Sequence, residues 1–133
     1  MKRILTALLL AAALLLCAAC GQGAQSTATF APGDIQDLGE GAVAFDLQVR
    51  YENLTAKHFR IHTDAATVGE ALLGVGLIKA GDNGVYVTVD AVTADYDADG
   101  AYWAFYVGGD FATQGLDETP IEPGAMYGLV YSK

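Results

Sequence analysis

The chain has 133 residues, with seven Lys and Arg against sixteen Asp and Glu, and a formal net charge of −9 at pH 7. This length corresponds to one domain, and the acidic balance argues against nucleic-acid binding, which needs clustered Lys and Arg. Both cysteines, Cys17 and Cys20, lie near the N-terminus. Residues 21–133 therefore contain no disulfide, no thiol nucleophile and no thiolate metal site.

The first twenty residues resemble an export signal. A short basic start precedes an almost unbroken run of Leu and Ala from Ile4 to Ala19. This run is shorter than the roughly 20 apolar residues of a membrane-spanning helix, and it fits a secretory signal peptide. Small residues before Cys20 resemble a bacterial lipobox, with Cys17 where Leu is usual. We expect residues 1–19 to be a lipoprotein signal peptide and Cys20 to be lipidated; a signal peptide with full release is the alternative.

A polar segment separates this signal from the folded part. Residues 21–39 consist largely of Gly, Gln, Ser, Thr, Ala, Pro and Asp, with little periodicity. Such a composition buries too little apolar surface to offset the entropy of ordering. The sequence thus predicts a flexible stalk over residues 20–39 and a folded domain over residues 40–133. A lipid at Cys20 would hold this domain outside the cytoplasm, on a bacterial cell membrane that the protein does not span.

Two alternating runs predict a hairpin at the start of the folded part. Apolar and polar residues alternate from Val43 to Glu52, and again from His58 to His62. A period of two is typical of strands with one solvent-exposed face. We expect the two runs to pair in antiparallel fashion.

A short helix is predicted next. Thr67 and Glu70 have the spacing of a capping box, with Thr67 as the N-cap. Apolar residues then recur at helical intervals as far as Val75, while Gly74 and Gly76 favour a stop. So short a helix depends on packing against a sheet.

Three further strands complete the prediction. Residues 85–90 and 127–131 alternate, whereas residues 102–107 (YWAFYV) are apolar on both faces, which favours a central, covered strand. The order of two strands, one helix and about three strands predicts an α+β fold. In that fold one helix packs across a mixed sheet of about five strands, and a β-grasp is the leading candidate.

Several of these segments, in this order, resemble a known family. They are residues 67–73 (TVGEALL), Gly76-Leu77-Ile78, residues 102–107, Gly115 and residues 124–131. Over about residues 42–132 the chain is similar to the transcobalamin C-terminal-like domain, a domain of unknown function found in bacterial surface lipoproteins. The resemblance implies a β-grasp-like fold related to the smaller, ligand-binding domain of vertebrate cobalamin carriers.

The same resemblance implies a ligand and a partner. The ligand would be cobalamin or a related corrinoid, and the positions that match the ligand-facing region are Trp103, Phe111, Gln114 and Gly115. In the carriers a large helical barrel completes the site, and this sequence contains no such barrel. Because bacterial relatives are associated with membrane uptake, a transporter component is an expected partner.

Residues 95–100 (DYDADG) form an acidic motif. Asp95, Asp97 and Asp99, followed by Gly100, match the start of a calcium-binding loop, in which oxygen ligands converge on a hard cation. The closing Glu of such a loop is replaced here by Tyr106. An acidic turn, stabilised by Asp side chains that bond nearby backbone amides, is the alternative reading.

His58 and His62 have a spacing that would suit a metal on a helix. On a strand they lie about 13 Å apart, too far for one ion to bridge. We expect them to stand with Arg60 on the exposed face of the hairpin, as a basic stripe that is solvated or binds an anionic partner.

The aromatic run divides between two faces of its strand. Trp103, Phe105 and Val107 share one side, and Tyr102 and Tyr106 share the other. One side should pack under the helix. The other side either binds an apolar ligand or packs in a core or interface.

The sequence favours binding over catalysis. No Cys remains in the folded part, no Ser lies in a nucleophile elbow, and the carboxylates fall mostly in predicted turns. We therefore expect no enzymatic activity. The main hypothesis is a membrane-anchored small-molecule-binding module, with a corrinoid as candidate ligand, that serves an uptake system. The alternative is a cell-surface protein-interaction or adhesion module without such a ligand.

Overall fold

The structure is a computed structural model that describes residues 34–133. The predicted signal peptide, the lipidation site Cys20 and most of the predicted stalk lie outside the described residues. In the part that is described, no helix is long and apolar enough to cross a membrane. The elements are β1 (Ile35–Gly39), β2 (Val43–Arg50), β3 (Ala56–Thr63), α2 (Val68–Gly74), β4 (Ile78–Ala80), β5 (Tyr86–Val89), β6 (Val92–Thr93), α3 (Tyr96–Asp99), β7 (Tyr102–Val107), β8 (Asp110–Phe111), the 3-10 turn η1 (Leu116–Glu118) and β9 (Met126–Ser132).

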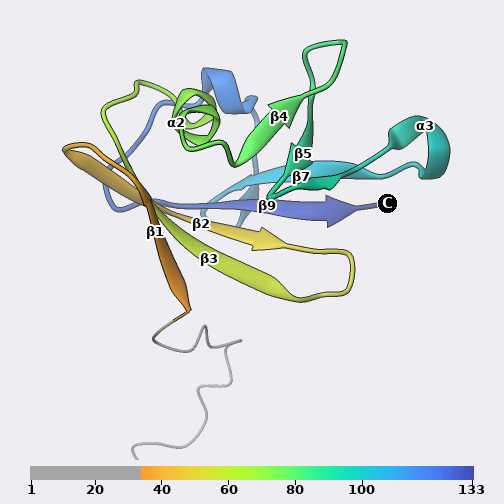
Figure 1. The fold of residues 1–133 in the computed structure, drawn as a ribbon, viewed down its shortest axis with the longest axis horizontal. Coiled ribbons are helices and arrows are strands. Elements are labelled where there is room, and N and C mark those ends of the chain that lie inside the picture. The colour runs from red at the N-terminus through yellow and green to blue at the C-terminus, as the bar shows by residue number, and fades with distance from the viewer. Residues whose placement is uncertain (1–33) are drawn as a thin grey trace, which may run out of the picture. The chain divides into compact units, whose positions relative to one another are not determined.

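A six-stranded mixed sheet carries the fold, in the order β1-β3-β2-β9-β7-β8. Strands β2 and β3 form the predicted antiparallel hairpin, and β9 runs parallel to β2 and antiparallel to β7. Helix α2 lies across one face of this sheet (Figure 1). A second sheet of three short strands, β4-β5-β6, accompanies it. The α+β, β-grasp-like prediction is confirmed.

The core lies between α2 and the large sheet, and Tyr127 is at its centre. Its ring packs edge-on against Phe45 at 5.3 Å and stacks with Phe105 at 6.1 Å. Its hydroxyl donates to the Pro120 carbonyl and accepts from the Glu122 amide, at 3.3 and 3.1 Å. Because these bonds satisfy the hydroxyl, Tyr127 can be buried to 1% exposure without an unpaired polar group.

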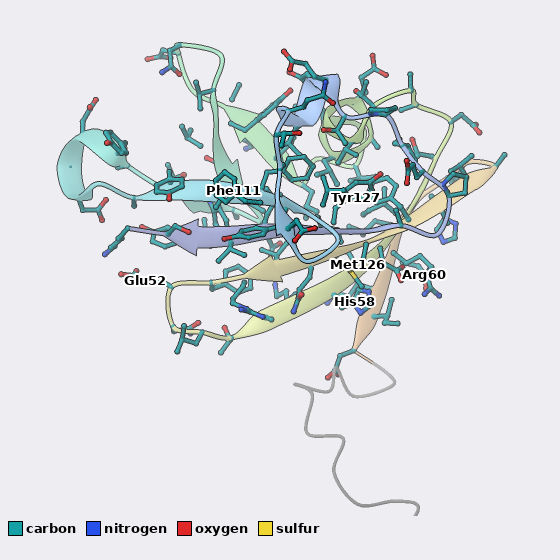
Figure 2. The ribbon with its side chains drawn as sticks, turned by 180° about the vertical axis from the view of Figure 1, so that it is seen from behind. Glu52, His58, Arg60, Phe111, Met126 and Tyr127 are labelled. Atoms are coloured by element: carbon teal, nitrogen blue, oxygen red, sulfur yellow. The ribbon has the colours of Figure 1, made fainter. Side chains whose placement is uncertain are left out.

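Alternation along the strands separates this core face from an open face. Tyr127 points toward α2, whereas Met126, His58 and Arg60 lie on the opposite side of the sheet (Figure 2). Successive strand residues face opposite sides of a sheet, so β2 contributes Phe45, Leu47 and Val49 to the core and the residues between them to the open face.

Helix α2 has the predicted beginning and end. The Thr67 hydroxyl accepts from the Glu70 amide at 3.3 Å, and the Glu70 carboxylate returns to the Ala66 amide at 3.2 Å. At the other end Gly76 has a left-handed φ of 72°, and the Leu77 amide bonds back to the Leu72 carbonyl at 3.0 Å. This is the bonding of a Schellman motif, which satisfies carbonyls that the helix end leaves open.

Three sequence predictions require correction. Residues 35–39, expected at the end of the stalk, form β1, which pairs with β3. Residues 86–89 join the small sheet instead of the large one. Strand β7 is not central: it lies one strand from the edge, and its ends, Tyr102 and Val107, are 44% and 40% exposed. On one face of β7, Phe105 packs in the core; on the other face, Tyr106 packs against Phe111 of β8.

The turn between β5 and β6 contains a residue, Ala91, whose backbone strain a substitution can remove. Asp90 and Ala91 have φ values of 45° and 64°, and they alone connect the paired Val89 and Val92. A two-residue hairpin requires positive φ at both positions, and Gly adopts this region without the steric cost of a Cβ.

We expect Ala91→Gly to raise the free energy of unfolding by roughly 0.5–1 kcal/mol. Urea denaturation measures this change. In Ala44→Gly, within the extended strand β2, the same substitution should lower stability instead. A lower stability of Ala91→Gly would contradict the left-handed conformation at residue 91.

Candidate functional site

A broad groove lies between the loop joining β4 to β5, the short helix α3 and the start of β7. Its volume is about 760 Å³, within the range of small-molecule sites. Four aromatic residues line it, Tyr86, Tyr96, Tyr102 and Trp103, together with three carboxylates, Asp82, Asp95 and Asp97. We call this site the aromatic groove.

Trp103 is held in place by contacts on several sides. Its indole Nε1 donates to the Val92 carbonyl at 3.1 Å. Its ring meets Tyr131 and Tyr51 edge-on, at 5.3 and 6.2 Å between centroids. A side chain fixed in this way loses little further freedom when a ligand stacks on it, which reduces the cost of binding.

Other walls of the groove are exposed to solvent. Tyr96 is 71% exposed, Val85 58% and Tyr102 44%. Single exposed apolar residues are ordinary, but a group of them around one hollow is typical of a binding surface. The aromatic groove therefore presents the uncovered Tyr96 ring beside a rigid indole.

The clamp behind Trp103 centres on Asp90. Its carboxylate accepts from the Tyr51 hydroxyl at 2.5 Å and from the Lys57 ammonium at 2.6 Å. Burial raises the pKa of Asp90, but the hydrogen bonds from Lys57 and Tyr51 outweigh it, and the pKa lies below its usual value. The pKa of Tyr51 is raised by its own burial and by this carboxylate. Asp90 thus joins the small sheet to the β2–β3 hairpin.

Asp117 supports the groove from the other direction. The Tyr86 hydroxyl donates to its carboxylate at 2.7 Å. This approach depends on Gly69 in α2, because a Cβ there would lie 2.1 Å from the same oxygen. Burial, and then the Asp117 carboxylate, raise the pKa of Tyr86 to about 12. The Tyr86 side chain is therefore fixed in position and remains protonated at neutral pH.

Two of the predicted calcium ligands, Asp95 and Asp99, make different contacts within the chain. The Asp95 side chain caps α3 by accepting from the Ala98 amide at 3.0 Å. Asp99 accepts from the Ala101 amide and lies 3.6 Å from the Lys133 ammonium. These contacts are those of the acidic turn. Among residues 34–133 no group of three or more His, Cys, Asp or Glu residues is arranged to hold a metal ion, and calcium binding stays a prediction.

The predicted ligand-facing residues also separate. Trp103 lines the aromatic groove, whereas Phe111 and Gln114 line a second hollow of about 400 Å³ beside Tyr127. Gly115 caps the turn η1, and its carbonyl accepts from the Thr119 hydroxyl at 2.8 Å. The structure thus offers two places to test for a ligand, with one of them at each end of β7.

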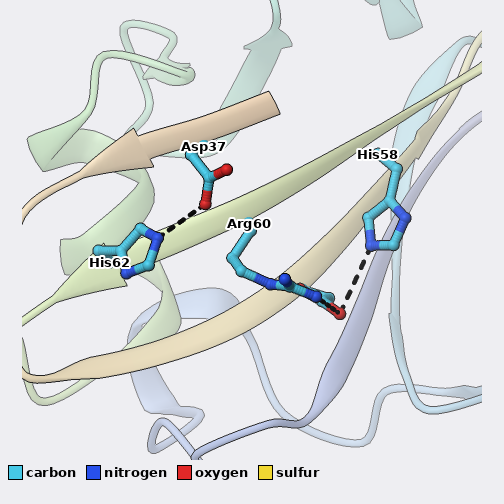
Figure 3. Close-up of polar contacts among 5 residues, drawn as sticks. Asp37, His58, Arg60 and His62 are labelled. Atoms are coloured by element: carbon cyan, nitrogen blue, oxygen red, sulfur yellow. Dashed lines mark hydrogen bonds and ion pairs between the residues drawn. The ribbon is translucent and has the colours of Figure 1, made fainter. Parts of the chain in front are cut away.

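The hairpin face differs from the expected exposed basic stripe. His58 is only 7% exposed, and Asp46 lies 3.6 Å from its Nε2 (Figure 3). Asp46 also accepts from Arg60 at 2.9 Å, and this hydrogen bond holds the pKa of Asp46 below its usual value. His62 contacts Asp37 of β1 at 2.8 Å. Acids from neighbouring strands therefore lie beside all three side chains, and Asp46 pairs with the Arg60 guanidinium.

Sequence reasoning singled out Trp103, Asp95 and Asp97 for separate roles, but it did not place them in one groove. In the sequence, Tyr86 was assigned to the polar face of an alternating strand, and Tyr96 to an acidic turn. Asp90 and Asp117 carried no signal, since their partners lie 33–39 and 31 residues away. The only indication of this groove in the sequence was the closeness of Tyr96, Tyr102 and Trp103 to one another along the chain.

Comparison with known proteins shows the fold. No model of a protein family and no curated protein matches the chain. A solved structure from Ruminococcus gnavus, provisionally described as a metal-binding protein, aligns with a TM-score of 0.62 and 28% identity over 69% of this chain and 98% of its own. Haptocorrin in complex with Cbi (cobinamide) aligns with a TM-score of 0.55 and 15% identity over 68% of this chain and 25% of its own. The chain thus spans about a quarter of haptocorrin and has the same kind of fold as that part.

The pKa of Tyr86 provides a test of this geometry. A raised pKa stabilises the folded state fully below the unfolded value of about 10, and the stabilisation is lost as pH rises from 10 through 12. We expect phenolate absorbance to show a titration near pH 12 that is absent in Tyr86→Phe. Asp117→Asn should lower that pKa, and Asp110→Asn should not. A Tyr86 titration near pH 10 in the unaltered protein would contradict the hydrogen bond to Asp117.

Proposed function

We propose that this protein is a small-molecule-binding module that is exported, lipidated at Cys20 and tethered to the outside of a bacterial cell membrane. The observation that carries the binding role is the aromatic groove, where Trp103 is fixed by a hydrogen bond and two ring contacts beside a hollow of about 760 Å³. The anchor is supported by the apolar run and the small residues that precede Cys20.

A corrinoid is the first ligand to test. The support is the likeness in fold to haptocorrin, whose structure contains cobinamide. In this proposal the tethered domain captures its ligand outside the cell and passes it to a transporter component in the same membrane. No catalytic step is part of the proposal.

A protein-interaction or adhesion module is the second candidate. The observation that favours it is the exposure of large apolar side chains away from the groove, with Leu54 at 82% and Phe111 at 62%. Under this alternative these residues bind another surface protein, and the aromatic groove has no small ligand.

Titration of the exported, processed protein with cobinamide distinguishes these candidates. Trp103 is the single Trp of the chain, so its fluorescence reports directly on the groove. We expect saturable quenching beyond the optical absorption of the ligand, which free tryptophan amide measures in parallel. Calorimetry then gives the affinity independently of the fluorescence.

Two matched variants identify which hollow binds. Tyr96→Ala removes an exposed ring of the aromatic groove and should weaken binding about tenfold, whereas Phe111→Ala removes an exposed ring of the second hollow and should have no effect. The reverse result would move the site to Phe111 and Gln114. No heat and no quenching at high micromolar cobinamide would reject the corrinoid.

The anchor has its own test. Cys20→Ser should move the protein from the membrane fraction to the soluble extracytoplasmic fraction, since one acyl-modified terminus is the proposed attachment. Cys17→Ser is the matched control and should leave the protein with the membrane. If Cys20→Ser stays in the membrane fraction, the lipid anchor at this residue is wrong.

A further inference from the structure

We infer that the aromatic groove selects an organic cation, a ligand that presents an ammonium or quaternary nitrogen to its aromatic rings. The inference rests on the proposed binding role of this groove and adds the charge of the ligand. It follows from the aromatic walls, from the distribution of charge around them, and from the way each lining side chain is held.

The aromatic walls of the groove have the composition of a binding site for an organic ammonium ion. The faces of Trp and Tyr rings attract a cation within about 6 Å of the ring centre, and Trp does so most strongly. Trp103 is already fixed by Val92, while the Tyr96 ring remains largely uncovered. The Tyr86 hydroxyl is occupied by Asp117, which does not line the groove, so Tyr86 contributes a fixed ring.

The charge around these rings has one sign. Asp82, Asp95 and Asp97 line the groove, and no Lys, Arg or His does. Among the described residues three of the five Lys and Arg side chains are paired with acids elsewhere: Lys57 with Asp90, Arg60 with Asp46, and Lys133 with Glu52 and Asp99. The remaining two, Arg50 and Lys79, lie on β2 and β4 and do not line the groove.

The arrangement suits an organic cation better than a bare metal ion. A metal ion needs several oxygen ligands that converge at short distance, but Asp95 is committed to the cap of α3 and Asp99 is directed to Lys133. A quaternary nitrogen has no such requirement. It gains from ring faces and from the general negative field, while its apolar substituents cover the exposed rings.

The test uses three probes of similar size and different charge: benzyltrimethylammonium, benzyl alcohol and phenylacetate. Each is titrated into the exported, processed protein, with Trp103 fluorescence and calorimetry as readouts. We expect the cation to bind at least tenfold more tightly than the neutral probe, with no binding of the anion. Added salt should weaken binding of the cation and leave the affinity of the neutral probe unchanged, because salt screens interactions between charges.

Variants of the carboxylates give a second readout. Asp82→Asn and Asp97→Asn change exposed side chains, and each should weaken binding of the cation about two- to fivefold. Their double variant should lose most of the preference for the cation. Asp110→Asn, an exposed acid at the second hollow, is the matched control and should bind the cation normally.

The outcomes separate this inference from the proposed function. Equal affinities for the cation and the neutral probe, or cobinamide binding without cation binding, would overturn the charge selection and leave the groove a binding site. If neither the probes nor cobinamide bind, both proposals fail. Cation binding that is unaffected by the double variant would also overturn the inference, since the carboxylates would then contribute nothing.

Discussion

The rest of the site depends on the hydrogen bonds that the Asp90 carboxylate accepts from the Tyr51 hydroxyl and the Lys57 ammonium. Asp90 lies at the tight turn of the small sheet, and its partners lie at one end of the β2–β3 hairpin. Small three-stranded sheets have little core of their own and need support from a larger body. This clamp supplies that support, and the bond from Trp103 to Val92 adds a second attachment on β6.

The groove follows from this attachment. Once the small sheet is fixed beside β7, the β4–β5 loop and α3 stand apart with aromatic residues between them. Asp117 then holds Tyr86 from the side of α2, where Gly69 leaves room for it. Because one polar bond orients Trp103 and another orients Tyr86, these two walls are ordered before any ligand arrives, which reduces the cost of binding.

How far the sequence could predict this arrangement differs from element to element. The hairpin, the capped helix and the last strand were predictable, since each depends on a local period or on a cap within a few residues. Strand β7 was misplaced because apolar residues on both faces indicate burial and not position in a sheet. His58 was misjudged for a related reason: its alternation placed it on the polar face, and only neighbouring strands decide whether that face is covered.

The sequence by itself determined the fold class, the acidic charge and the candidate anchor at Cys20, because these properties depend on composition and short-range pattern. The tertiary structure alone decided that Trp103, Tyr86, Tyr96 and Tyr102 surround one groove, and that Phe111 and Gln114 belong to another hollow. It also showed that Asp95 caps helix α3 and that Asp99 lies near Lys133, two contacts that the acidic motif alone did not specify. The physical reason is that a site consists of residues distant in the chain, and their meeting depends on strand order and on contacts such as Asp90 with Tyr51, which no local pattern encodes.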